Sequence, residues 1–229
     1  MPTDTAVILA GGFGKRLMPL TLDKPKPMLE VGGKPILDWL LKWLAGYDVK
    51  RAILAVGYMK EKIIDHIKDG SEHGIKVVYS EEDKPLGTGG AIKKASKLVD
   101  SEYFFVVNGD VITNLNPRAL EERIGDAYAC IALVKMRSPY GMVEIDEKGA
   151  VTSFLEKPLL NHYINAGVLL ISKKTSELLP DEGPMETTTL PLLARERKLA
   201  GVKFDSYWRS VDSIKDLEEV NAEIGNVFA

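Results

Sequence analysis

Positive charge and glycine are concentrated in one loop near the start of the chain. The run AGGFG at residues 10–14 leads directly into Lys15 and Arg16, and Lys26 follows between two prolines. Glycine lets a backbone turn sharply and approach a ligand closely, and consecutive exposed N–H groups form a concavity that suits anions. An arginine can clamp a polyphosphate through several donors, so this loop is predicted to hold the triphosphate of a nucleotide.

Two better-known glycine motifs do not fit this loop. Arg16 stands where the dinucleotide-binding fingerprint requires a third glycine or an alanine. The Ser or Thr that completes a P-loop is missing after Lys15. Pro19, Pro25 and Pro27 keep the segment irregular rather than helical. A dehydrogenase is thereby excluded, whereas a glycine-rich turn with solvated charges stays open as the alternative to a phosphate site.

The glycine run belongs to a longer sequence motif. LAGGFGKRLMPLT at residues 9–21, followed by KPKPML at residues 24–29, resembles the signature of the sugar-1-phosphate nucleotidyltransferases. Later blocks of that family follow in the family's order: Pro85-Leu-Gly-Thr-Gly-Gly-Ala91, Asn108-Gly-Asp110, Tyr140-Gly141, Val143-Glu144, Phe154-Leu-Glu-Lys-Pro158 and Ile164-Asn-Ala-Gly167. The resemblance covers nearly the full chain. It implies attack by a sugar 1-phosphate oxygen on the α-phosphorus of a nucleoside triphosphate, which gives a nucleotide sugar and pyrophosphate.

The resemblance also implies roles for individual residues. Arg16 and Lys26 become the catalytic residues, because two anions must meet and charge builds up on the leaving pyrophosphate. The nucleotide is expected to contact Leu9, Ala10, Gly11, Gly12, Gly14, Glu82, Gly87, Thr88 and Asn108. The sugar phosphate is expected to contact Gly141, Glu156, Lys157 and Asn165. No general base is required, since the attacking phosphate oxygen is already an anion.

Two aspartates are the expected ligands of a magnesium ion. Asp110 follows an apolar run in the turn Asn-Gly-Asp, and the resemblance makes it a metal ligand, although an Asx turn is the alternative. Many relatives carry a second ligand in a Trp-x-Asp-x-Gly block, but Ser210 occupies that position here. In an extended segment, residues 210 and 212 face the same side. Asp212 is therefore predicted as the second ligand, with capping of the following helix as its alternative role.

Strands and helices alternate along the first half of the chain. The expected strands are Ala6–Ala10, Ala52–Val56, Lys76–Tyr79 and Tyr103–Val107, and the expected helices are Pro35–Ala45, Lys60–Lys68 and Ala91–Leu98. This order predicts an α/β fold with a doubly wound, mostly parallel, Rossmann-like sheet. Ligands of such sheets bind outside the carboxyl ends of the strands. The unusual residues follow the first, third and fourth strands, which is where a site would form.

The second half of the chain changes character. It is expected to contain a buried strand at 129–134, a hairpin at 141–154, a strand at 163–171, a helix at 186–195 and a strand at 203–211. A final helix should follow the capping box formed by Ser213 and Asp216. These elements predict a small mixed β subregion that holds the second substrate. With no linker or repeat in the sequence, residues 1–229 are expected to form one catalytic domain.

Composition limits the kinds of partner. The net charge of −3 and the absence of a broad basic run argue against nucleic-acid binding. The chain has no apolar window of membrane-spanning length and no apolar leader, so we expect no membrane contact and a cytoplasmic location. Its single cysteine, Cys130, lies in an apolar run and is predicted to be a core residue.

The expected substrates are a nucleoside triphosphate and a sugar 1-phosphate. Residues 80–88 and the Asn-Gly-Asp turn look most similar to mannose-1-phosphate guanylyltransferases and related heptose and muramic-acid enzymes, which favours GTP with mannose 1-phosphate or a related sugar. The alternatives are a phosphocholine-type cytidylyltransferase and a non-catalytic regulatory subunit that binds nucleotide sugar. The strongly apolar helix at 35–45 could form a homodimer contact or belong to the core.

Overall fold

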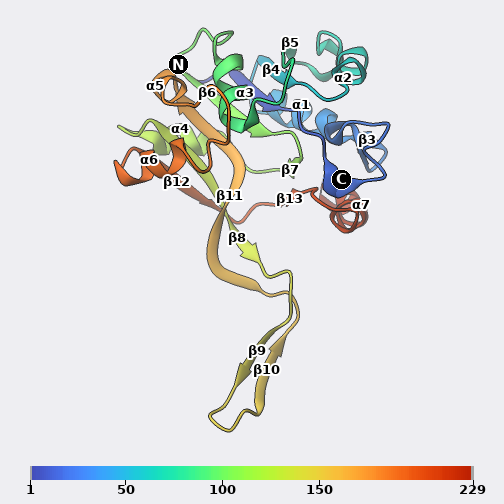
Figure 1. The fold of residues 1–229 in the computed structure, drawn as a ribbon, viewed down its shortest axis with the longest axis vertical. Coiled ribbons are helices and arrows are strands. Elements are labelled where there is room, and N and C mark those ends of the chain that lie inside the picture. The colour runs from blue at the N-terminus through green and yellow to red at the C-terminus, as the bar shows by residue number, and fades with distance from the viewer. Residues whose placement is uncertain (1, 228–229) are drawn as a thin grey trace.

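A seven-stranded sheet forms the centre of the molecule (Figure 1). The computed structural model describes residues 2–227, apart from the side chain of residue 226. Residues 1 and 228–229 of the predicted domain lie outside this range. The strand order is β12-β8-β11-β6-β1-β4-β5. Only β11 in this sheet runs antiparallel to its neighbours, β6 and β8. The predicted mostly parallel α/β fold is confirmed.

The elements occur close to where the sequence predicts them. The sheet strands are β1 Thr5–Leu9, β4 Arg51–Val56, β5 Lys76–Glu81, β6 Tyr103–Asn108, β8 Ala129–Arg137, β11 Leu159–Ser172 and β12 Leu199–Phe204. The helices are α1 Ile36–Gly46, α2 Lys60–Ile67, α3 Gly87–Ser96, α4 Arg118–Ile124, α5 Lys173–Glu177, α6 Thr189–Arg195 and α7 Ile214–Val227. Short strands pair outside the main sheet: β2 Glu30–Val31 with β3 Lys34–Pro35, β7 Val111–Thr113 with β13 Trp208–Ser210, and β9 Met142–Ile145 with β10 Val151–Leu155.

Apolar residues cover both faces of the sheet, as the continuous apolar strands predict. Ala6 and Ile8 of β1 join one buried cluster with α1, α4 and α7, whereas Val7 points into the second cluster with α3 and α6. Cys130 is fully buried, as predicted, and burial raises the pKa of its thiol to about 11. Among residues 2–227, none of the helices has both the length and the apolar character needed to cross a bilayer.

Helix α1 belongs to the core. Its residues Ile36, Leu37 and Leu40 are at most 1% exposed. The indole N–H groups of Trp39 and Trp43 donate hydrogen bonds to the backbone carbonyls of Val31 and Leu115. These contacts account for its apolar character without a second copy of the chain.

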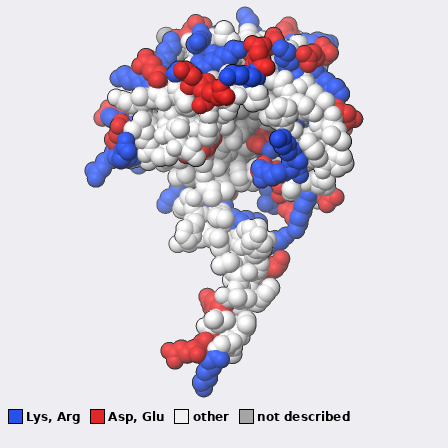
Figure 2. Space-filling model, viewed as in Figure 1, with Lys and Arg blue, Asp and Glu red and all other residues white. Residues whose placement is uncertain are grey.

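A long hairpin, the arm (residues 138–158), projects from the body (Figure 1). It contains β9 and β10, which pair only with each other. Several large apolar side chains on it are exposed, including Tyr140 at 76% and Phe154 at 64%. On the face that Figure 2 shows, most of the arm is uncharged, with a few acidic side chains along it and charges of both signs at its tip. The arm leaves the body between β8 and β11, at the carboxyl ends of the parallel strands.

Two element predictions need correction. The strand expected at 203–211 is two strands: β12 lies at the edge of the main sheet, and β13 pairs with β7 in a separate two-stranded sheet. Helix α3 begins at Gly87, four residues before the predicted start. Both differences bear on the site. The early start of α3 includes Gly87 and Thr88 in the helix, and the pairing of β13 with β7 brings the end of β13 beside Asp110.

Candidate active site

The glycine-rich loop lines a cavity of about 450 Å³ at the carboxyl ends of β1 and β6. All nine predicted nucleotide contacts and all four predicted catalytic and metal residues line it. They are Leu9, Ala10, Gly11, Gly12, Gly14, Arg16, Lys26, Glu82, Gly87, Thr88, Asn108, Asp110 and Asp212. The four predicted sugar-phosphate residues are not among its lining. The structure thus brings together the nucleotide half of the predicted site.

The loop is held in shape from within. Gly14 adopts a φ of 60°, and a Cβ there would lie 3.0 Å from the Thr21 side chain and 3.1 Å from that of Lys26. The Thr21 hydroxyl donates to the Gly14 carbonyl over 3.0 Å, and the Tyr58 hydroxyl donates to the Thr21 carbonyl. Phe13 packs against the Tyr58 ring. Gly14 and these contacts therefore fix the backbone next to the Lys26 side chain, which extends into the cavity.

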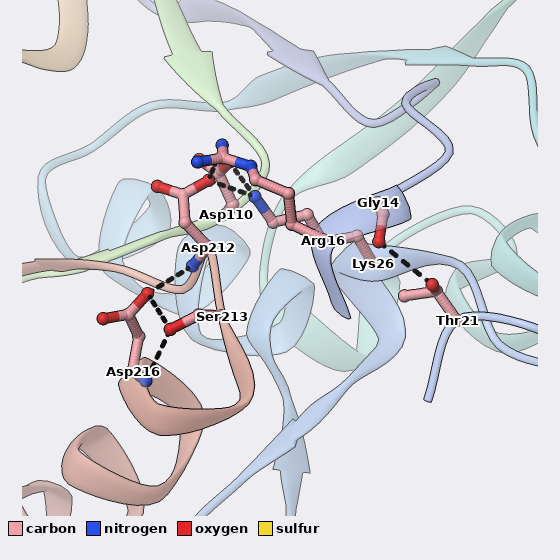
Figure 3. Close-up of polar contacts among 8 residues, drawn as sticks. All are labelled: Gly14, Arg16, Thr21, Lys26, Asp110, Asp212, Ser213 and Asp216. Atoms are coloured by element: carbon pink, nitrogen blue, oxygen red, sulfur yellow. Dashed lines mark hydrogen bonds and ion pairs between the residues drawn. The ribbon is translucent and has the colours of Figure 1, made fainter. Parts of the chain in front are cut away.

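Two cations and two carboxylates meet in the cavity (Figure 3). The Lys26 ammonium donates to Asp110 Oδ2 over 2.5 Å and to Asp212 Oδ1 over 2.9 Å. Arg16 Nη2 donates to the same Asp212 oxygen over 2.8 Å. The Lys26 side chain is 14% exposed and that of Arg16 is 77% exposed. Lys26 is therefore a fixed, partly buried charge, and Arg16 has room to turn toward a ligand.

A small antiparallel sheet brings the two aspartates together. Ser210 of β13 pairs with Val111 of β7, and the Val211 N–H donates to the Asp110 carbonyl over 2.9 Å. On the other side, the Gly109 N–H donates to the Leu9 carbonyl, and a Cβ at residue 109 would lie only 2.3 Å from that oxygen. The Asn-Gly-Asp turn thus needs its glycine in order to seat Asp110 beside the first strand.

Asp212 lies beside Asp110 in the cavity, as the sequence predicts. Burial acts to raise the pKa of Asp212, but the Lys26 ammonium, with help from Ser210 and Arg16, outweighs burial and holds the pKa below its usual value. Ser210, which stands where many relatives have aspartate, thus supports the carboxylate two residues later. Capping of α7 falls to Ser213, whose Oγ accepts the Asp216 N–H, while Asp216 Oδ2 accepts the Asp212 N–H.

Glu82 forms the wall of the cavity near Gly11. One carboxylate oxygen accepts the Leu86 N–H over 3.0 Å, and the other would lie 2.9 Å from a Cβ at Gly11. Burial raises the pKa of Glu82, against a smaller opposing effect of the Leu86 hydrogen bond. A half-buried carboxylate fixed by a backbone donor is suited to accept hydrogen bonds from a nucleobase.

The second glycine-rich stretch serves the fold as well as the cavity. Cβ atoms at Gly87, Gly89 and Gly90 would lie 2.4 to 2.7 Å from atoms of the segment 180–183. The Thr88 hydroxyl donates to Glu186 and accepts the Met185 N–H. These glycines let the start of α3 pack closely against segment 180–186, a role that the sequence analysis missed because the partner lies nearly 100 residues away.

The predicted sugar-phosphate residues lie at the base of the arm and beside it. A Cβ at Gly141 would lie 3.1 Å from Glu156 Oε2, and the Asn165 side chain accepts the Gly167 N–H on β11. Lys157, with a φ of 45°, lies beside Lys215 of α7, whose ammonium lowers the Lys157 pKa. Lys215 lies in the first turn of α7 and follows Asp212 by three residues in the sequence.

Comparison with known proteins identifies related sequences along almost the whole chain. A sequence model of the family described as "Nucleotidyl transferase" matches residues 5–227. Mannose-1-phosphate guanyltransferase of Yarrowia lipolytica is 36% identical over 223 residues, covering 92% of this chain and 61% of that protein. D-glycero-alpha-D-manno-heptose 1-phosphate guanylyltransferase of Campylobacter jejuni is 40% identical over 171 residues, covering 73% of this chain and 76% of that protein.

A solved structure shares the fold over its full length. HddC from Yersinia pseudotuberculosis matches with a TM-score of 0.79 and 32% identity, covering 97% of this chain and 100% of that one. The same protein in complex with GMP-PN matches with a TM-score of 0.78. The chain spans about three fifths of the mannose-1-phosphate guanylyltransferases it matches.

Proposed function

The chain belongs to the nucleotidyl transferase family, and we propose that it transfers a nucleotidyl group from a nucleoside triphosphate to a sugar 1-phosphate. The observation that carries this proposal is the cluster of Arg16, Lys26, Asp110 and Asp212 inside the cavity lined by the glycine loop. Such a cluster offers both cations for phosphates and carboxylates for a metal ion, which are the needs of this reaction.

The reaction requires charge stabilisation rather than proton transfer. A phosphate oxygen of the sugar 1-phosphate attacks the α-phosphorus, the bond from that phosphorus to the bridging β-phosphate oxygen breaks, and pyrophosphate leaves with the electron pair. We assign Arg16 to the leaving pyrophosphate, because its exposed guanidinium can bind two oxygens at once. Lys26 would lie at the reacting phosphates, where its fixed ammonium needs no reorganisation as charge develops.

The donor set suits Mg²⁺. Asp110 and Asp212 each give one carboxylate oxygen to the Lys26 ammonium, and each keeps a second carboxylate oxygen for a metal ion. Magnesium prefers such hard oxygen ligands, one or two carboxylates together with substrate phosphates. We propose that these two aspartates hold Mg²⁺, which neutralises phosphate charge when bound. We also propose a cytoplasmic location, where nucleoside triphosphates are available.

Glu82 favours guanine among the common bases. Guanine presents two adjacent donors, N1–H and the N2 amino group, and a carboxylate can accept both. The backbone donor that fixes Glu82 leaves its second oxygen beside Gly11 in the cavity. The guanylyl specificity in the names of the related proteins from Yarrowia and Campylobacter agrees with this assignment. We therefore propose GTP as the nucleotide and a mannose-type sugar 1-phosphate as its partner.

Pyrophosphate release measured over a panel of substrates tests the function and the base together. The panel crosses the common nucleoside triphosphates with hexose and heptose 1-phosphates and phosphocholine, in the presence of Mg²⁺. We expect turnover with GTP, and we expect Glu82→Gln to reduce kcat/KM for GTP by about 10–100-fold, the value of hydrogen bonds to a charged acceptor. Turnover with CTP and phosphocholine would instead support a cytidylyltransferase. Tight binding of nucleotide sugar without any turnover would support the regulatory subunit.

The base of the arm is our candidate for the sugar phosphate. Lys157 and Lys215 bring two like charges together at this place, an arrangement that an anionic phosphate would relieve. We expect Lys157→Gln to raise KM for the sugar 1-phosphate by about tenfold, the order of one phosphate contact, and to leave KM for GTP unchanged. Lys148→Gln, in the exposed turn of the same arm, is the matched control. Equal effects of the two variants on KM would contradict the assignment.

A further inference from the structure

Two of the three histidines of the chain converge on one carboxylate outside the catalytic cavity. Asp38 Oδ1 lies 2.9 Å from His66 Nε2 and 3.2 Å from His73 Nε2. All three ligand atoms lie within 4.8 Å of one another. None of these residues lines the cavity described above, and no motif of the transferase reaction includes them. We call them the His–Asp cluster.

Three separate elements build this cluster. Asp38 lies in the first turn of α1, His66 in the last turn of α2, and His73 ends the 3-10 turn Ser71–His73, which packs against α1. The turn is fixed by Gly70, whose φ is 78° and where a Cβ would lie 2.3 Å from the Ile75 carbonyl oxygen. The His73 side chain is 6% exposed and that of Asp38 is 15% exposed, whereas His66 is 40% exposed. The cluster is therefore preformed, with one side open to water.

From this geometry we propose that the His–Asp cluster binds a divalent transition ion of the zinc class. Two imidazole nitrogens and one carboxylate oxygen, with water in the remaining position, are a common ligand set for Zn²⁺. Ligand atoms of a tetrahedral zinc ion, at bond lengths of about 2.0 to 2.1 Å, lie roughly 3.3 Å apart. The observed separations of 2.9 and 3.2 Å are close to that value. Small side-chain rotations would therefore open the cluster around an ion.

The protonation of the cluster is compatible with metal binding. A histidine binds a metal through an unprotonated ring nitrogen, so binding through Nε2 requires the ring proton of each histidine on Nδ1, and Asp38 binds as the carboxylate. Mg²⁺ is not expected here, since it prefers oxygen ligands to imidazole. His73 Nδ1 has no hydrogen-bond partner among the described residues. The lack of an outer partner for this ring predicts weaker binding than in sites where each histidine is oriented by a second hydrogen bond.

A bound ion would join α2 and the turn at residue 73 to α1. These elements also meet through the hydrogen bond between His66 and Asp38, the 3.2 Å contact of His73 Nε2 with Asp38 and the apolar contacts behind them. An ion that binds only the folded state stabilises that state by mass action. We therefore expect the bound ion to have a structural role. This role does not depend on the transferase reaction, so failure of one proposal leaves the other standing.

Titration of metal-free protein tests the site. The chain is treated with a chelator, desalted and titrated with Zn²⁺ and, for its visible absorption, with Co²⁺. We expect one ion to bind per chain, a visible absorption spectrum of bound Co²⁺ that is typical of a low coordination number, and a higher Tm of the protein with Zn²⁺. His66→Ala and Asp38→Asn should abolish all three effects, and the exposed His66 allows a variant that does not disturb the core.

Two controls make the outcome decisive. His162→Ala removes the remaining histidine, which is exposed on β11 and distant in sequence from the cluster, and it should bind the ion as wild type does. Asp110→Asn should also retain the binding, because it alters only the catalytic cavity. Absence of zinc binding by the wild-type chain would overturn the proposal. So would zinc binding that survives His66→Ala and Asp38→Asn or that is lost in Asp110→Asn.

Discussion

Replacing Lys26 with glutamine should reduce kcat by about 10²–10³-fold, the effect of removing one preorganised charge donor from a transition state. Lys26 stands between Pro25 and Pro27 in the sequence. Its side chain is 14% exposed, and its ammonium contacts both aspartates. The position of the charge is therefore fixed before any substrate arrives. Steady-state pyrophosphate release at saturating GTP and sugar 1-phosphate measures the effect directly.

The neighbouring lysine supplies a control for this experiment. Lys24 lies two residues earlier in the same loop, but its ammonium pairs with Glu30 at the surface, where both side chains are about half exposed. Such exposed pairs contribute about 0–1 kcal/mol, so Lys24→Gln should keep both kcat and Tm close to wild type. If Lys26→Gln retains kcat within a few fold while remaining folded by Tm, Lys26 is not at the reacting phosphates.

Asp110→Asn should cause a loss of similar size and should raise the Mg²⁺ concentration needed for half-maximal rate. The variant keeps the shape of the side chain and removes the negative charge that a magnesium ion requires. Loss of several kcal/mol of charge stabilisation corresponds to about 10²–10³-fold in rate at 1.36 kcal/mol per factor of ten. Asp48→Asn is a suitable control, because the Asp48 side chain is 83% exposed and pairs with Lys50 at the surface.

The two aspartates should also act as a unit. Asp212→Asn is expected to reproduce the effect of Asp110→Asn, and the double variant should lose much less than the product of the two single losses. A full multiplicative loss would indicate that the carboxylates serve separate groups. A large loss in Asp110→Asn that coincides with a fall in Tm, and is matched by Asp48→Asn, would show a folding defect and would remove Asp110 from the proposed metal site.

Local patterns predicted the sheet and the loop well, because both depend on residues close in sequence. The apolar strand at 6–10 and its glycine loop appear as expected, and so does the alternation that gives a parallel sheet. Asp212 is predicted from the resemblance, which places a ligand at position 210, together with the alternation of an extended segment, and the structure brings Asp212 within hydrogen-bonding distance of Lys26. The roles of these residues in the reaction stay predictions until they are measured.

Long-range pairing explains what the sequence did not reveal. The strand expected at 203–211 contains the break Asp205-Ser206, after which β13 pairs with β7 instead of β8. Nothing local distinguishes these two pairings, since β7 and the buried first part of β8 are both apolar. Similarly, the glycines at 87–90 resemble a ligand loop in sequence, but their neighbours at 180–183 determine how closely they must pack.

The pairing of Lys26 with Asp212 spans 186 residues, and this separation governs when the cavity can become complete as the chain is made. Ribosomes add about 5–20 residues per second, and the N-terminal parts of a chain can fold first. The glycine loop, β1 and the Asn-Gly-Asp turn are synthesised in the first half, so Lys26 and Asp110 can meet early. The second carboxylate arrives only after the arm and β11 have emerged. A chain interrupted before residue 212 would keep its phosphate loop and lack half of its predicted metal ligands.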